Sequence, residues 1–271
     1  MMGIAAGLAD LLKRLIVTAL LGLLVGWIAS ERASALDLDV VGTAFRVTAD
    51  GRVFEGADLV DAVLTIAFDG APVRARIASV VPDPARPSVL LHDLQVVGDD
   101  GVERPLCNEG PDGLRLGFPI RGRTDATGAL RAAEPGAFEF VCTAGAQGKC
   151  VRFGYDPWGS AADGAPMLDH FNACVRMVRA DYCGDGRTFT RDGTLIGFGD
   201  SAGVNTFDPA GETVRLEAAW GSEGAVCVAR TRLEDVVSRS ELTDLCPRLA
   251  GAMSADCSLD TPGALILNHS R

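Results

Sequence analysis

The chain has 271 residues and a formal net charge of −11 at pH 7, from 25 basic and 36 acidic residues. An acidic chain of this kind is not expected to bind nucleic acid or an anionic membrane surface. Its length suits one large domain or two small ones. Lys13 and Lys149 are its only lysines, a bias that we attribute to a GC-rich genome.

The first 35 residues carry the three parts of a secretory signal peptide. Lys13 and Arg14 precede a mostly apolar run from Leu15 to Ala29, and a small-residue triplet then ends at Ala35. We therefore predict export to the periplasm or the extracellular space, with cleavage after Ala35. The apolar run is shorter than the roughly 20 residues that a membrane span needs, so we expect no span in the mature chain. An uncleaved N-terminal anchor is the alternative.

Residues 36–144 have the pattern of a β-rich module. Short stretches in which polar and apolar residues alternate are separated by turn residues such as Asp50-Gly51 and Asp69-Gly70. Alternation with a period of two places one face of a strand on a core and the other in water. Short strands at this spacing are typical of an antiparallel sandwich or barrel.

Residues 145–271 are predicted to form a cysteine-rich module with one main amphipathic helix. Pro166 suits a first helical turn, and apolar residues then recur at spacings of three and four, as one face of a helix requires. This stripe comprises Leu168, Phe171, Val175, Val178 and Tyr182. The other faces carry Asp169, Asn172, Arg176 and Arg179. Gly184 and Gly186 are expected to end the helix.

The later segments TLIGF, ETVRLEAAW, GAVCVART and GALILN are predicted strands, and residues 233–249 are predicted to form one or two short helices broken at Pro247. The expected fold class is therefore α+β, mostly β. An antiparallel β-rich N-terminal module is followed by a disulfide-rich module that contains the helix.

All eight cysteines lie after the expected cleavage site: Cys107, Cys142, Cys150, Cys174, Cys183, Cys227, Cys246 and Cys257. An even number of cysteines in an exported chain predicts structural disulfides. No pair has C-x-x-C spacing, so neither a zinc ribbon nor a thioredoxin-type redox site is expected.

Helix geometry restricts how these cysteines can pair. A helix that persisted from Cys174 to Cys183 would separate their Cα atoms by roughly 13 Å, whereas a disulfide needs them within about 7 Å. These two cysteines should therefore not pair with each other. The pairs that we expect follow chain order: Cys107 with Cys142, Cys150 with Cys174, Cys183 with Cys227, and Cys246 with Cys257.

Residues 174–186, CVRMVRADYCGDG, resemble the signature of the ADYC domain family, which is named after the run found here at Ala180 to Cys183. KCVRFGYDPW before this stretch, and EAAWGSEGAVCVARTR and ALILNHS after it, are also similar to that family. The resemblance covers roughly Ala137 to the C-terminus, and its extension into the β-rich half is left open. The family is a bacterial exported domain of unknown function, so the resemblance implies an exported context and assigns no reaction and no catalytic residue.

The helix and the polar turn after it supply the candidate ligand-binding residues. Acids on the turn could offer oxygens to calcium, but their spacing lacks the pattern of a calcium-binding loop. Ion pairs with neighbouring arginines are the simpler interpretation. A nucleophilic pair of His170 with Cys174 would leave another cysteine unpaired. The candidates are His170, Arg176, Arg179, Asp181, Asp185 and Asp192, and no metal or cofactor is predicted.

The pentapeptide GDSAG at 199–203 fits the G-x-S-x-G nucleophile elbow of α/β-hydrolases, with Ser201 at its centre. Asp256 or Asp260, and then His269, follow in the order that a catalytic triad could use. The elbow must open a helix, however, and the turn-forming residues that follow cannot do so. No glycine-rich oxyanion loop and no repeated βαβ pattern accompanies it, so an ordinary loop is preferred.

These observations predict an exported, disulfide-stabilised protein that binds an unknown ligand or envelope partner, or forms part of the cell envelope or extracellular space. We do not expect an enzyme. The alternative is a secreted hydrolase that uses Ser201 or the acidic turn around Asp185. The sequence does not predict the ligand or the oligomeric state.

Overall fold

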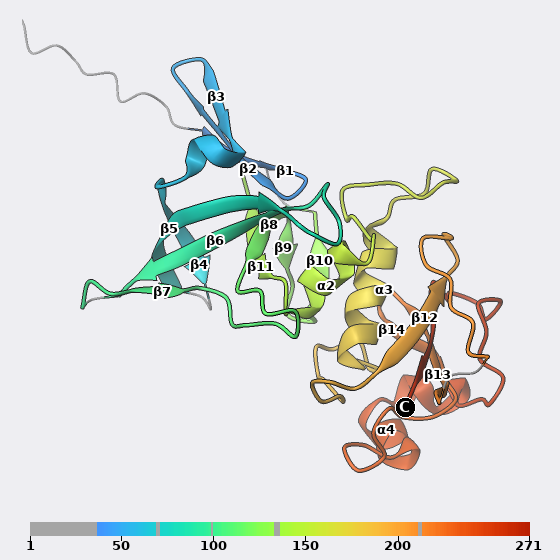
Figure 1. Ribbon diagram of the computed structural model, residues 1–271. Helices are drawn as coiled ribbons and strands as arrows, with labels where there is room; N and C mark the ends of the chain where they lie inside the picture. The colour runs from blue at the N-terminus through green and yellow to red at the C-terminus, as the bar shows by residue number, and fades with distance from the viewer. Residues whose placement is uncertain (1–36, 69–70, 99, 133–135, 211–212) are drawn as a thin grey trace, which may run out of the picture. The chain divides into compact units, whose positions relative to one another are not determined.

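The computed structural model describes residues 37–68, 71–98, 100–132, 136–210 and 213–271 (Figure 1). The predicted signal peptide lies outside the described residues. Asp37–Thr48 and Val53–Arg271 form one compact unit, to which Ala49–Arg52 does not belong. Within the described ranges, no helix is long and apolar enough to cross a membrane.

The first half of the chain is built from antiparallel strands, as predicted. A three-stranded sheet has the order β1-β2-β3 and a six-stranded sheet has β11-β8-β6-β5-β4, with β7 paired to β6, while β9 and β10 form a separate pair. The elements are β1 (Asp37–Val41), β2 (Ala44–Ala49), β3 (Arg52–Glu55), the 3-10 helix η1 (Gly56–Leu59), β4 (Val63–Phe68), β5 (Ala71–Pro82), β6 (Leu90–Val97), β7 (Glu103–Pro105), β8 (Gly117–Arg121), β9 (Arg123–Thr124), β10 (Leu130–Arg131) and β11 (Phe138–Cys142).

The second half contains the helices and a four-stranded antiparallel sheet with the order β12-β15-β13-β14. Its elements are α2 (Ala146–Arg152), α3 (Leu168–Arg179), β12 (Ile196–Asp200), β13 (Arg215–Gly221), β14 (Gly224–Val228), α4 (Arg239–Leu245), the 3-10 helix η2 (Pro247–Ala252) and β15 (Ile266–Ser270). The main helix α3 packs against α2 and against β13, β14 and β15. The fold class is thus α+β and mostly β, as expected, although α2 was not anticipated.

Two hydrophobic cores account for most of the packing. Phe45, Ile77 and Leu94 are fully buried in a core made by the strands of the first half. A larger core joins Phe118 of β8 to residues of α3 and of the four-stranded sheet, so apolar packing continues across residue 145. The division into two modules at that point stays a prediction.

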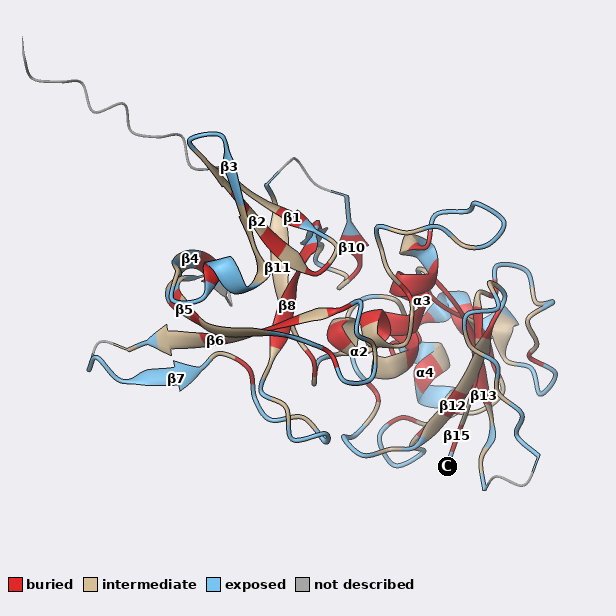
Figure 2. Ribbon diagram, turned by 45° about the horizontal axis from the view of Figure 1, so that its top comes forward, coloured by how far each residue is buried: buried red, intermediate tan, exposed pale blue. Residues whose placement is uncertain are grey.

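The main helix is buried on nearly all sides (Figure 2). The predicted apolar stripe is present, and the polar residues Asn172 and Arg176 on the other faces are buried as well: they are 2% and 1% exposed. Their hydrogen bonds explain this burial. The Asn172 side chain accepts from the Leu130 N–H and donates to the Leu130 carbonyl, while Arg176 forms a buried ion pair with Asp181.

The end of α3 differs from the expectation. Ala180, not a glycine, takes the left-handed conformation at the helix end, with φ of 51°. Gly184 is needed one turn later for a different reason: its φ is 72°, and a Cβ there would lie 1.9 Å from the Glu223 carbonyl oxygen. The glycine allows the turn after the helix to touch the loop before β14.

All eight cysteines form disulfides, and two predicted pairs are confirmed: Cys107–Cys142 and Cys150–Cys174. The other two predictions are wrong, because Cys183 bonds to Cys246 and Cys227 bonds to Cys257.

Strand alternation explains the correction. On β14, Val228 belongs to the core that contains α3, whereas Cys227 belongs to a small cluster with Cys257. Successive side chains of a strand point to opposite faces, so Cys227 points away from Cys183.

Candidate functional site

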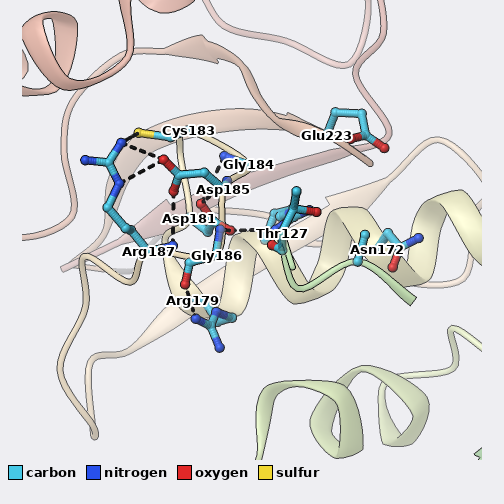
Figure 3. A network of polar contacts seen from close by, with 12 residues as sticks. Thr127, Asn172, Arg179, Asp181, Cys183, Gly184, Asp185, Gly186, Arg187 and Glu223 are labelled. Atoms are coloured by element: carbon cyan, nitrogen blue, oxygen red, sulfur yellow. Dashed lines mark hydrogen bonds and ion pairs between the residues drawn. The ribbon is translucent and has the colours of Figure 1, made fainter. Parts of the chain in front are cut away.

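The turn after α3, residues 180–186, is organised by the buried carboxylate of Asp181 (Figure 3). Its Oδ1 accepts hydrogen bonds from the N–H groups of Gly184 and Asp185 at 2.9 and 3.2 Å. Its Oδ2 accepts from the Gly186 N–H at 2.9 Å and from Arg176 at 2.6 Å. A carboxylate with four donors is satisfied inside the fold, so it has no free lone pairs for a ligand.

Tyr182 anchors the same turn in a second buried network. Its hydroxyl donates to Glu217 at 2.9 Å and accepts from the Arg232 N–H at 2.7 Å. Arg232 and Asn268 both donate to the other oxygen of Glu217. Burial, together with the neighbouring Glu217 charge, raises the pKa of Tyr182 well above its usual value. The tyrosine therefore stays a neutral hydrogen-bond donor.

Each residue of the 180–183 run thus has a role in the fold. Ala180 ends the helix, Asp181 organises the turn, Tyr182 joins the turn to the sheet, and Cys183 bonds to Cys246. Asp185 is on the surface and pairs with Arg187 at 2.6 Å. No group of three acidic, histidine or cysteine side chains suited to a metal ion occurs in the described parts of the chain.

His170 makes a contact that the sequence did not predict. Its Nε2 lies 3.0 Å from Oγ of Ser201, just beyond β12. His170 Nδ1 is buried and has no hydrogen-bond partner among the described residues. Burial lowers the pKa of His170, against the opposing effect of nearby Asp200, so the imidazole is neutral at neutral pH.

The predicted Ser201 partner, His269, lies instead on β15, with its ring 5.5 Å from the Phe207 ring. Asp200 and His269 line a cavity of about 240 Å³ to which neither Ser201 nor His170 contributes. The residues after Ser201 form turns and irregular structure rather than a helix, as expected, so the elbow geometry is absent there.

A larger cavity, of about 550 Å³, lies against the last turn of α3, and we call it the α2–α3 cavity. Its walls come from α2, the end of α3, the loop at 188–195 and the start of β12. Of the six predicted ligand-binding residues, Arg179 and Asp192 line it, whereas His170, Arg176, Asp181 and Asp185 do not.

The fold holds these walls firmly in place. The Cys150–Cys174 disulfide joins α2 to α3 with a Cα–Cα distance of 5.8 Å. The Phe189 N–H and the Thr188 hydroxyl both donate to the Arg179 carbonyl, at 3.1 and 2.8 Å. The loop therefore starts from a fixed point beside the helix end.

The charges that line the α2–α3 cavity are not balanced. Arg232 is paired with Glu217 and Arg191 with Asp235. The Lys149 side chain has neither a hydrogen bond nor an ion pair within the described residues.

Arg179 donates to the Gly186 carbonyl, its Nε is buried and unpaired, and it has no acidic partner in the described ranges. Asp192 is the single acid on the wall. The cavity therefore has two cations without an acidic partner, Lys149 and Arg179, and only one acid.

Sequence reasoning missed Lys149. The side chain lies next to Cys150 on a helix that was not predicted, and an isolated lysine is not a motif. The signal that could have identified it is its rarity, because it is the only lysine in the part of the chain that the structure describes.

Comparison with known proteins gives a family and nothing narrower. A model of the ADYC domain matches residues 56–234, which is more than half of the chain. The match includes most of the β-rich half, into which the resemblance left an extension open, and it ends before the C-terminus, so the last strand lies outside it. No curated protein and no solved structure matches the chain.

Proposed function

The chain belongs to the ADYC domain family, and from that premise we propose that it is an exported binding module that holds a small anionic ligand in the α2–α3 cavity. The observation that carries the proposal is the pair of cations, Lys149 and Arg179, that line this cavity without an acidic partner. A pocket of several hundred Å³ with a few convergent polar groups is typical of small-ligand sites.

The net charge of the whole chain strengthens the argument from the excess positive charge in the cavity. The chain as a whole carries a net charge of −11, which disfavours anions, so a cavity with excess positive charge differs from the chain as a whole. Hydrogen bonds between a cationic side chain and a carboxylate or phosphate are roughly twice as strong as neutral ones. An anion in the cavity would supply the partner that the described residues do not.

Binding to the α2–α3 cavity can be measured by calorimetric titration of the oxidised protein with acetate and with inorganic phosphate at low ionic strength. We expect Lys149→Gln to weaken binding at least about tenfold, as the loss of one charge-assisted hydrogen bond would. Arg74→Gln, which changes an exposed cation outside the cavity, is the control and should bind like wild type. Equal binding by Lys149→Gln would overturn the proposal, and so would a wild type that binds neither these anions nor any longer carboxylate.

Export is supported by the four disulfides, since such bonds persist in oxidising compartments. Sequencing the N-terminus of the mature protein tests this part of the proposal. The expected first residue is Leu36, and a protein that kept Met1 in the reducing cytoplasm would contradict it.

A hydrolase is the second candidate, and the contact between Ser201 and His170 is the observation that favours it. In this reaction Ser201 Oγ attacks an ester carbonyl while its proton passes to His170 Nε2. The imidazolium then protonates the departing alcohol, and water releases the acyl group. No residue in the described ranges orients Nδ1 of His170, which makes this candidate the weaker one.

A fluorophosphonate probe distinguishes a reactive serine from a structural contact. Stoichiometric labelling of Ser201 that is lost in His170→Asn would support the hydrolase. If wild type and Ser201→Ala show the same lack of labelling, the contact serves only to tie α3 to the end of β12.

A further inference from the structure

We infer that the α2–α3 cavity takes a free carboxylate with a long apolar tail, rather than a small inorganic anion. This inference rests on the proposed function, namely that the cavity binds an anion, and it adds the chemistry of the rest of the ligand. Cationic and apolar side chains line the same cavity, and an amphiphile matches both; we call the apolar ones its apolar side.

The apolar side is formed by side chains from three elements. Phe153 follows α2, Val178 lies on α3, and Ile196 begins β12. All three are half-buried at the edge of the main core. Leu195, beside them, is 54% exposed, so its side chain could lose most of its contact with water to an apolar ligand.

A second cavity continues the apolar surface. It has a volume of about 280 Å³ and shares Gly145, Ala146 and Arg179 with the α2–α3 cavity. Phe140 of β11 and Val175 of α3 are among its other lining residues. Arg179 therefore lies where two partly apolar hollows meet.

This arrangement predicts how the ligand lies. The carboxylate faces Lys149 and Arg179, and the tail covers Phe153, Val178 and Leu195. An apolar tail gains about 0.8 kcal/mol for each methylene group that it buries, which corresponds to an affinity gain of about fourfold per methylene. A headgroup alone would gain nothing from the apolar side.

A homologous series of ligands separates this inference from the proposed function. Acetate, hexanoate, octanoate and decanoate are titrated into the oxidised protein below their micelle concentrations, with decanol as the uncharged control. We expect affinity to rise by up to about fourfold per methylene, and decanol to bind much more weakly than decanoate. A series with constant affinity that still depends on Lys149 would overturn the inference and leave the proposed function intact. No binding by any member would overturn both.

A matched pair of variants locates the tail. Leu195→Ser removes an exposed apolar side chain from the cavity, whereas Val102→Ser removes one that is 50% exposed elsewhere. We expect Leu195→Ser to weaken decanoate binding severalfold without changing acetate binding, and Val102→Ser to change neither. Equal decanoate affinity in both variants would contradict the placement of the tail.

Chemical protection gives a readout that does not depend on substitution. An amine-reactive acetylating reagent modifies Lys149 as the only lysine of the described chain, and mass spectrometry of the peptide measures the extent. Saturating decanoate is expected to slow this acetylation at least about tenfold, and decanol is expected to leave it unchanged. Acetylation at the same rate with and without decanoate, under conditions where calorimetry detects binding, would place the ligand elsewhere and overturn the inference.

Discussion

The turn at residues 180–186 and the α2–α3 cavity lie at the same end of α3. They differ in whether their polar groups have partners within the fold. In the turn, the Asp181 carboxylate has four donors, and Tyr182 both donates and accepts. In the cavity, Lys149 and Arg179 keep their charges without an acidic partner among the described residues. The residues that give the family its signature therefore stabilise the fold, whereas the proposed anion site depends on the unneutralised charges beside them.

The largest expected effect comes from breaking the turn. Asp181→Asn removes the negative charge that pairs with Arg176, which is 1% exposed, and leaves a buried cation without compensation. We expect a loss of about 3–5 kcal/mol in the free energy of unfolding, measured by urea denaturation of the oxidised protein. Asp185→Asn, which changes the exposed pair with Arg187, is the control and should lose far less. Equal losses would show that the turn is not held by its buried acid.

A buried histidine in the β-rich half of the chain sharpens the comparison. His92 is fully buried, and burial lowers its pKa to about 4. The folded pKa is below the unfolded value of about 6.5. The contribution of neutral His92 to the free energy of unfolding is therefore fully present above pH 6.5. This stability is lost as the pH falls toward 4, since only the unfolded chain takes up the proton.

The size of the His92 effect follows from the two pKa values. We expect wild type to lose about 3 kcal/mol more of its free energy of unfolding than His92→Phe between pH 6.5 and 4. Denaturant titrations at several pH values measure how the free energy of unfolding of each protein changes with pH, which gives one slope for wild type and one for His92→Phe. Parallel slopes would show that His92 is reached by water in the folded protein.

A smaller effect is expected from Tyr182→Phe. The ring and its packing are kept, but Glu217 and the Arg232 N–H each lose a buried hydrogen bond. Leaving such groups unpaired costs about 1–3 kcal/mol. A stability equal to that of wild type would mean that the network can rearrange around the missing hydroxyl.

The smallest change in stability is expected on the cavity side. Lys149→Gln removes a half-buried side chain that has no partner among the described residues, so the free energy of unfolding should change by no more than about 0.5 kcal/mol, even though we expect anion binding to weaken at least about tenfold. A large destabilisation would show that Lys149 serves the fold, and the contrast between the turn and the cavity would then disappear.

Local sequence patterns predicted the helices and strands better than they predicted which residues those elements contact. The spacing of Phe171 and Val175 was enough to predict α3, but it could not show that Arg176 on the same helix is buried, because its partner is set by the turn and by Thr127. The order of Ser201 and His269 suggested a pair, yet the fold brings His170 to Ser201 from 31 residues away. Such contacts depend on packing between elements, which a local sequence pattern does not predict.

Packing between elements also explains why the candidate residues have different surroundings. Asp181 lies in the turn, and Arg179 lies two residues earlier, at the end of α3. One points into the fold and is saturated, whereas the other lines a cavity. No motif marked Lys149, and only its rarity could have, because its place in the cavity depends on α2 lying against α3 through the Cys150–Cys174 disulfide.

The last two disulfides interleave, since Cys227 lies between Cys183 and Cys246 in the chain, and Cys246 lies between Cys227 and Cys257. A chain that enters an oxidising compartment N-terminus first offers Cys183 and Cys227 to each other before Cys246 arrives. Chain-order pairing is then a kinetic trap, and reaching the native set requires thiol–disulfide exchange. Refolding of the reduced protein should accumulate a Cys183–Cys227 intermediate, visible by peptide mapping, that a disulfide isomerase clears.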